Sequence, residues 1–152
     1  MKREYRDLTR LIERLHRRFL DVLRAELVRL GVKNINAVQA MILANIDDEE
    51  MVIRDLVERG YYQGSNVSYN IKKLVDLGYL VHERTAHDRR SVKVRLTAKA
   101  RDVVAKVHAF EERNADRLEA DGLSGDRVDA ASQALRVLER LWADYIRYGE
   151  QR

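Results

Sequence analysis

The sequence contains no cysteine and no proline among its 152 residues. Without cysteine the protein has no disulfide bond, no thiolate nucleophile and no cysteine-based redox sensor. The absence of proline, together with a charged fraction of 36%, is typical of a helix-rich soluble protein. We therefore expect a helical protein whose function does not depend on cysteine.

Long hydrophobic runs are also absent. No apolar stretch approaches the length of a membrane span, and the opening residues, MKREYRD, are not followed by the apolar core of a signal peptide. We therefore expect a cytoplasmic protein that does not enter a membrane.

Signals for catalysis are missing as well. The chain has no glycine-rich loop that could cradle a phosphate and no recognisable pair of nucleophile and base. Its histidines fall in four different expected elements, with no pair at i, i+4, so a metal site is not expected. They are His16, His82, His87 and His108. The sequence thus predicts a protein that is not an enzyme and needs no cofactor.

The residues that are present can form one core. With 45% hydrophobic residues in a chain of this length, we expect a single domain that spans residues 1–152. The formal net charge is only +4, but it is unevenly distributed. Residues 61–101 contain nine basic and three acidic side chains, whereas residues 45–60 contain two basic and six acidic ones. Positive charge is therefore concentrated in one segment, as in nucleic-acid-binding proteins.

Within that segment, the residues from Ser65 to Asp76 have the periodicity of an amphipathic helix. One narrow arc of this helix collects the apolar side chains Val67, Ile71, Leu74 and Val75, which predicts a buried stripe. The remaining side chains are polar or charged and face away from the stripe or lie at its flanks. They are Ser65, Asn66, Ser68, Tyr69, Asn70, Lys72, Lys73 and Asp76.

Such a polar face suits the major groove of double-stranded DNA. Hydroxyl and amide groups near the start of the helix can reach base edges, while Lys72 and Lys73 can contact phosphates. Two simpler interpretations remain open. Ser65 and Asn66 could serve only as helix caps, and the two lysines could form an ordinary solvated face.

A hairpin is expected directly after this helix. Residues 79–84 and 91–96 form two extended runs, and the second alternates apolar with basic side chains. The tip between them carries Asp88, Arg89 and Arg90, and adjacent arginines suit the narrow, negative minor groove. Arg89 could instead be a plain surface charge, and Arg90 could form only an ion pair with Asp88.

A short helix over residues 53–59 and a turn over 61–64 precede the polar-faced helix. A short helix, a turn and a polar-faced helix are typical of a helix-turn-helix. With the basic hairpin added, the sequence predicts a mainly α fold, a winged helix-turn-helix with a two-stranded β-wing. This DNA-binding lobe is expected to span residues 35–97, and Asn36 with Gln39 predicts a capping box at the start of its first helix.

The regions outside this lobe are expected to form long amphipathic helices. Apolar residues recur at three- and four-residue spacing over residues 5–30, and again after Thr97 and after the GLSG break at residues 122–125. These apolar stripes are too rich to remain in solvent. We therefore expect residues 1–34 and 98–152 to form a dimerisation lobe, in which the helices of two copies pack together.

At this point the chain resembles a known family. Residues 55–80 match the pattern of the multiple-antibiotic-resistance regulator (MarR) family without gaps, and DRRSVKVRLT, residues 88–97, resembles its wing signature. The segments LIERLHRRFLD and GYYQGSNVSYN resemble a subgroup that includes the regulator LdtR. The resemblance implies a homodimeric repressor or activator on a pseudo-palindromic operator, with Arg90 in the minor groove and Asp88 orienting it.

The resemblance also implies a small effector, often aromatic and acidic, that binds near the junction of the two lobes. Phe19 and Phe110 could line such a pocket, although aromatic residues at helical spacing more often belong to the core. Three positions depart from the family pattern. Val52 replaces a capping hydroxyl, Tyr69 a frequent basic residue and Ala100 a common glycine.

Two other function classes remain open beside the ligand-responsive regulator. The first is an architectural or constitutively bound DNA-binding protein without an effector. The second is a helical protein-interaction module, which would leave the net charge of +6 in residues 61–101 unexplained.

Overall fold

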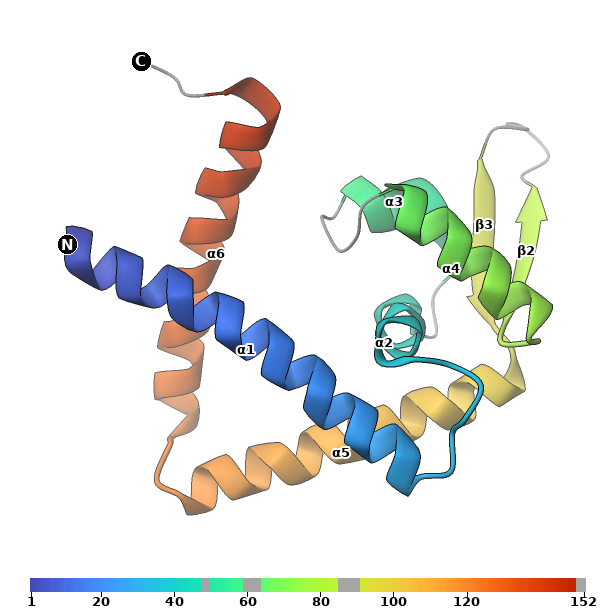
Figure 1. The fold of residues 1–152 in the computed structure, drawn as a ribbon, viewed down its shortest axis with the longest axis horizontal. Coiled ribbons are helices and arrows are strands. Elements are labelled where there is room, and N and C mark those ends of the chain that lie inside the picture. Colours follow the sequence, from blue (N-terminus) through green and yellow to red (C-terminus); the bar gives the residue numbers. More distant parts are fainter. Residues whose placement is uncertain (48–49, 59–63, 85–90, 150–152) are drawn as a thin grey trace. The chain divides into compact units, whose positions relative to one another are not determined.

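The computed structural model describes residues 1–47, 50–58, 64–84 and 91–149, except for the side chain of Ser65, and it is mostly helical (Figure 1). In chain order the elements are α1 (Lys2–Arg29), α2 (Ala37–Ile46), β1 (Met51–Val52), α3 (Ile53–Glu58), α4 (Gly64–Asp76), β2 (Leu80–Arg84), β3 (Val92–Leu96), α5 (Ala98–Ala120) and α6 (Gly125–Tyr148). The chain divides into two units, residues 1–110 and residues 111–152, and each is described by itself.

The core of the first unit is one continuous apolar cluster. It combines the C-terminal end of α1 with α2, α3, α4, the small sheet and the first half of α5. Its largest fully buried side chains are Leu23, Ile42, Leu43, Ile46, Leu56, Leu74, Val67, Val94 and Val107. The expected helix-turn-helix elements are therefore held together by a shared core, as the apolar periodicity indicated.

Strands β2 and β3 form the expected two-stranded hairpin, and β1 adds a third antiparallel strand to the sheet, in the order β1-β3-β2. Strands β2 and β3 pair along their full length, from Leu80 with Leu96 to Arg84 with Val92. The added strand pairs Met51 with Val94 and Val52 with Lys93. A strand of two residues has no alternation to recognise in the sequence, and its pairing depends on a partner about forty residues away.

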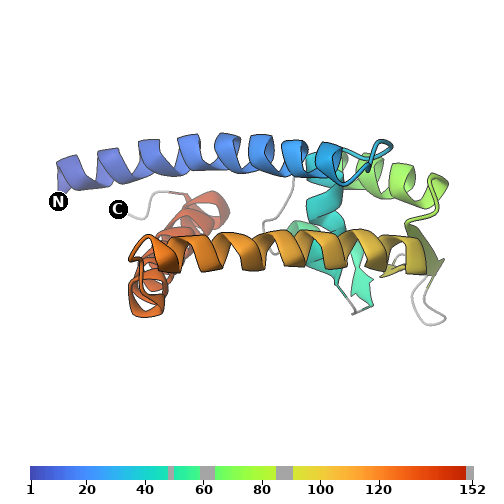
Figure 2. The same ribbon diagram turned by 90° about the horizontal axis from the view of Figure 1, so that it is seen from below.

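Local signals at the start of the chain are confirmed. α1 ends before Gly31, whose φ of +72° lies in the left-handed region that glycine adopts without strain. α2 begins at the expected capping box, in which Asn36 Oδ1 accepts from the Gln39 N–H at 2.8 Å and Gln39 Oε1 accepts from the Asn36 N–H at 3.0 Å. Figure 2 shows α2 crossing near the C-terminal end of α1, from which the N-terminal half of α1 extends away.

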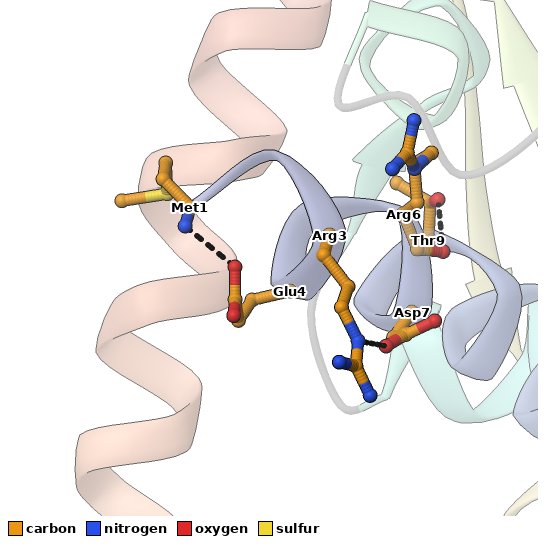
Figure 3. A network of polar contacts seen from close by, with 6 residues as sticks. All are labelled: Met1, Arg3, Glu4, Arg6, Asp7 and Thr9. Atoms are coloured by element: carbon orange, nitrogen blue, oxygen red, sulfur yellow. Dashed lines mark hydrogen bonds and ion pairs between the residues drawn. The ribbon is translucent and has the colours of Figure 1, made fainter.

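The N-terminal half of α1 is held mainly by contacts within its own turns (Figure 3). The Met1 ammonium group lies 2.5 Å from Glu4 Oε2, and the Arg3 guanidinium lies 3.9 Å from Asp7. The hydrogen bond from Met1 lowers the pKa of Glu4 from its ordinary value. All of these side chains are strongly exposed, so they support the helix locally and stabilise the tertiary structure little.

Thr97 caps α5 as expected, since its Oγ1 accepts a hydrogen bond from the Ala100 N–H at 3.3 Å. In the second unit, α5 ends at Ala120, and Gly122 has a φ of +89° in the break before α6. Leu138 is the one buried side chain among residues 111–149. None of the helices in the described part of the chain is long and apolar enough to cross a membrane.

Candidate nucleic-acid interface

Helix α4 separates an apolar face from a polar face as the sequence predicted. Val67, Ile71 and Leu74 are buried in the core of the first unit, and Val75 packs against it. On the opposite side, Tyr69 is 68% exposed. The other side chains exposed on this helix are Asn66, Ser68, Lys72, Lys73 and Asp76. The face proposed to meet DNA is thus open in this subunit.

Asn70 does not belong to that exposed face, which corrects its expected placement. Its side chain is only 9% exposed. The Asn70 Oδ1 accepts a hydrogen bond from Gln39 Nε2 at 3.1 Å, and the Asn70 Nδ2 donates one to the Asn66 carbonyl at 2.9 Å. Asn70 lies at the edge of the buried arc, where a polar residue can turn either way. Here it turns inward because Gln39 supplies a partner there.

Several other expected interface residues lie outside the described residues. These are the wing residues Asp88, Arg89 and Arg90, and the side chain of Ser65. Their roles in DNA binding stay sequence-based predictions.

The strands that carry the wing are described, and their basic side chains face outward. Val94 and Leu96 are buried, whereas Lys93 and Arg95 are exposed. Lys93 Nζ lies 3.5 Å from Glu50, which directly precedes β1, and Arg95 lies 3.5 Å from Glu83 on β2. Both pairs are solvent-exposed and weak, so these bases can exchange their acidic partners for phosphates at small cost.

The C-terminal end of α4 is attached to the start of α5. Lys99 Nζ donates to the carbonyl of Leu77 at 2.9 Å, and Thr97 Oγ1 donates to the carbonyl of Gly78 at 2.7 Å. These contacts satisfy carbonyls that the end of a helix leaves without an intrahelical partner. Lys99 also lies over the ring of Tyr79, 4.3 Å from its centre. In the sequence Lys99 is recognisable only as a positive charge, because a hydrogen bond that spans 22 residues leaves no local signal.

The expected effector residues are not brought together in a described cavity. Phe110 is buried, whereas Phe19 remains exposed on α1. One hollow in the described part of the chain, about 450 Å³, lies on α1 and has a charged lining. Its lining residues are Asp7, Arg10, Glu13, Arg14 and Arg17. Within the described ranges no group of three potential ligands for a metal ion occurs.

Comparisons with known proteins agree with this architecture. Residues 35–100 match the model of the winged helix DNA-binding domain. The chain is 37% identical over 145 residues to the exopolysaccharide II synthesis transcriptional activator ExpG of Rhizobium meliloti, which covers 95% of this chain and 75% of ExpG.

Solved structures share the fold at lower identity. A putative MarR family regulator from Listeria monocytogenes, complexed with a 26mer DNA, is 20% identical with a TM-score of 0.78, over 95% of this chain and 96% of its own. FabT from Streptococcus pneumoniae, in complex with DNA, is 18% identical with a TM-score of 0.73, over 92% and 98%.

The identity to ExpG extends over nearly the whole chain, and the winged helix domain coincides with the segment that carries α4 and the sheet. The chain therefore belongs to the family of transcriptional regulators that includes ExpG, which are not enzymes; it carries a winged helix DNA-binding domain, and it shares its fold with MarR family regulators.

Proposed function

We propose that the protein acts as a homodimer that binds a pseudo-palindromic operator and controls transcription by occupying or leaving it. In each copy α4 enters the major groove, and the wing arginine, Arg90, enters the adjacent minor groove. The observation that carries this proposal is the division of α4 into a buried apolar face and an open polar face. A helix buried on all sides would not leave Tyr69, Lys72 and Lys73 in solvent together.

The polar face of α4 has the chemistry that DNA recognition requires. Asn66 and Ser68 lie in the first turns of the helix, where amide and hydroxyl groups can read base edges. Lys72 and Lys73 follow one turn later and suit the phosphate backbone. Tyr69 lies between these two groups, and in this arrangement its ring can pack against a base or a sugar.

The apolar surface of α1 supports a dimer. Tyr5, Leu8, Ile12, Leu15, Phe19 and Val22 recur at alternating spacings of three and four residues, as in the contact seam of a coiled coil. All of them are exposed in the single chain except Ile12, which is partly buried. A second copy provides the apolar partner that such a seam needs.

Helix α6 has a seam of the same kind. Val128, Ala131, Leu135, Leu138, Trp142 and Tyr145 follow the same alternating spacing. Of these, Val128, Leu135, Trp142 and Tyr145 are large side chains that remain exposed. Two seams on two separate helices favour an extensive and symmetric interface over a single weak contact.

We further propose that a small effector, aromatic or acidic, modulates operator binding, and that the chain belongs to the subgroup that resembles LdtR. Both proposals rest on the family resemblance of the sequence, as does the expected cytoplasmic location beside the DNA. Phe19 and Phe110 stay the candidate effector contacts. An architectural DNA-binding protein without an effector is the alternative.

The decisive experiment is to sequence the DNA fragments that co-precipitate with the protein and to footprint the best site. We expect a protected inverted repeat whose half-sites are spaced by about one helical turn. Uniform protection without a preferred sequence would support the architectural alternative. Because ExpG is a transcriptional activator, a reporter fused to the footprinted site should be measured for activation as well as repression.

Footprints with and without candidate aromatic acids test the effector. A ligand that weakens or strengthens protection of the operator, but not non-specific binding, would support the regulated form. A cationic aromatic compound of similar size provides the matched control for an anionic benzoate. Only the anionic compound is expected to act.

A further inference from the structure

A continuous chain of hydrogen bonds connects α2 to α4 through side chains that are almost fully buried. The Asn36 backbone N–H donates to Gln39 Oε1 at 3.0 Å, and Gln39 Nε2 donates to Asn70 Oδ1 at 3.1 Å. Asn70 Nδ2 then donates to the Asn66 carbonyl at 2.9 Å. Gln39 is 5% exposed, so this link lies in the interior of the first unit. Every buried side-chain nitrogen and oxygen in the described part of the chain has a hydrogen-bond partner.

The two ends of this chain determine the orientation of both amides. A backbone N–H can only donate, so the oxygen of Gln39 must face Asn36 and its nitrogen must face Asn70. A backbone carbonyl can only accept, so the nitrogen of Asn70 must face Asn66 and its oxygen must face Gln39. All three bonds therefore run in one direction, and neither amide can reverse without leaving a buried group unpaired.

Apolar packing alone would hold α4 less strictly. The contacts of Val67, Ile71 and Leu74 are non-directional, and a small rotation of the helix changes their buried area little. A rotation of about 20° moves a side-chain tip by about 2 Å at a helix radius of about 5 Å. Such a shift would break a hydrogen bond, whose length varies by only a few tenths of an ångström.

We propose that Gln39 and Asn70 are positioning residues that set the rotation of α4 about its own axis, and with it the set of side chains that faces the DNA bases. Asn66 accepts the last bond of the chain through its backbone and exposes its own side chain, so the link ends within the reading face itself. This proposal rests on the proposed function, because it concerns the accuracy of base recognition. It assigns a role in specificity to two residues that cannot contact DNA.

The first test replaces both partners with leucine, in the variant Gln39→Leu/Asn70→Leu. Exchanging both members of a buried polar pair for apolar groups of similar size costs little by itself, but this variant also removes the acceptor of the Asn36 N–H, so its stability is measured by urea denaturation beside that of the wild type. We expect the ratio of operator affinity to affinity for unrelated DNA to fall by about tenfold or more, the size of one lost base contact. The salt dependence on unrelated DNA should stay unchanged, because the lysines are untouched.

A second variant, Gln39→Glu, keeps the capping box but removes the donor to Asn70. The carboxylate still accepts from the Asn36 N–H, so α2 keeps its cap, and Asn70 can meet it only by turning its Nδ2 away from the Asn66 carbonyl, which breaks the original link. Asn36→Ala is the matched control. It removes the side-chain cap of Gln39 N–H and lowers stability, yet leaves the bond from Gln39 to Asn70 in place. We expect loss of discrimination in the glutamate variant and full discrimination in the alanine variant.

The outcomes separate the two proposals. The wild-type protein is measured first, and a wild type without any preferred sequence would overturn the proposed function and this inference with it. A second outcome is that the wild type prefers the operator over unrelated DNA, and that the double leucine and glutamate variants show the same preference as the wild type. In that case the proposed function stands and the positioning role is overturned. Equal losses of discrimination in the glutamate variant and in Asn36→Ala would also overturn it, since general destabilisation would then suffice.

Discussion

The two units of the chain differ in how many of their apolar side chains are buried. Residues 1–110 enclose a continuous core to which every element from α1 to α5 contributes. Among residues 111–149 only the side chain of Leu138 is buried, although α6 carries many large apolar residues. One unit has the core of an independently stable fold, whereas the other presents surfaces that need a partner.

The same contrast occurs along the single helix α1. Its C-terminal turns bury Leu23 and Leu27, while Leu8, Leu15 and Phe19 of the N-terminal half remain exposed. All of these residues lie in one amphipathic pattern. Apolar periodicity therefore predicts which face of a helix is buried, but it does not predict whether the partner belongs to the same chain.

The largest effect is expected from a core residue of the first unit. Leu74→Ala removes a fully buried side chain of α4 and should lower the free energy of unfolding by roughly 3 to 5 kcal/mol. Val137→Ala on α6, where the side chain is 58% exposed and lies outside the seam, is the control and should change it by less than about 0.5 kcal/mol. Urea denaturation measures both, and similar losses would break the contrast between the units.

A charge in the α1 seam should act on assembly instead of on the subunit fold. We expect Leu15→Glu to weaken dimerisation by roughly 2 to 4 kcal/mol, because the carboxylate would be buried without a partner. Val28→Glu is the matched control on the same helix, since Val28 is strongly exposed but lies outside the seam. Sedimentation velocity measures the dimer and circular dichroism the helix content. A fully dimeric Leu15→Glu protein would remove α1 from the interface.

The same test applies to α6, where two positions differ in burial. Leu141→Glu and Leu138→Glu both introduce charge, but Leu138 is already buried in the single chain, whereas Leu141 is exposed. We expect Leu138→Glu to reduce the stability of the single chain and dimerisation together. Leu141 lies beside the seam, next to Trp142, and we expect Leu141→Glu to weaken dimerisation by the smaller amount of roughly 2 kcal/mol. If neither variant alters the sedimentation profile, α6 does not contribute to assembly.

The wing should contribute to specific binding without contributing to assembly. Arg90→Ala is expected to reduce operator affinity by roughly 1 to 3 kcal/mol while the dimer stays intact. An exposed arginine outside the DNA-binding segment, Arg136, provides the control through Arg136→Ala. Fluorescence anisotropy with a labelled operator measures both variants, and wild-type affinity of the Arg90 variant would exclude the wing from recognition.

The smallest effect is expected from a single phosphate contact. Lys73→Ala should weaken binding to operator and unrelated DNA alike, and should reduce the slope of log affinity against log salt by about one unit. Titrations at several salt concentrations give this slope directly. An unchanged slope would assign Lys73 to solvent.

Much of the candidate site could be recognised from local patterns. The exposure of Tyr69, Lys72 and Lys73 followed from helical periodicity, and the capping box of α2 followed from Asn36 and Gln39. Asn70 was placed on a flank of the helix and counted among the DNA contacts, but it lies at the boundary of the buried arc and its side chain is buried. Periodicity places a residue to within a fraction of a turn, and at that boundary the partner decides which way the side chain points.

The sequence by itself determined the helices, their apolar faces, the hairpin and the concentration of positive charge, because these depend on neighbours within a few residues. Tertiary structure alone decided the pairing of β1 with β3, the attachment of Lys99 to the end of α4 and the buried link from Gln39 to Asn70. Each of these contacts joins residues that are 22 or more positions apart. Directional bonds between distant residues form only once apolar burial has brought their elements together, and so they leave no periodic trace in the chain.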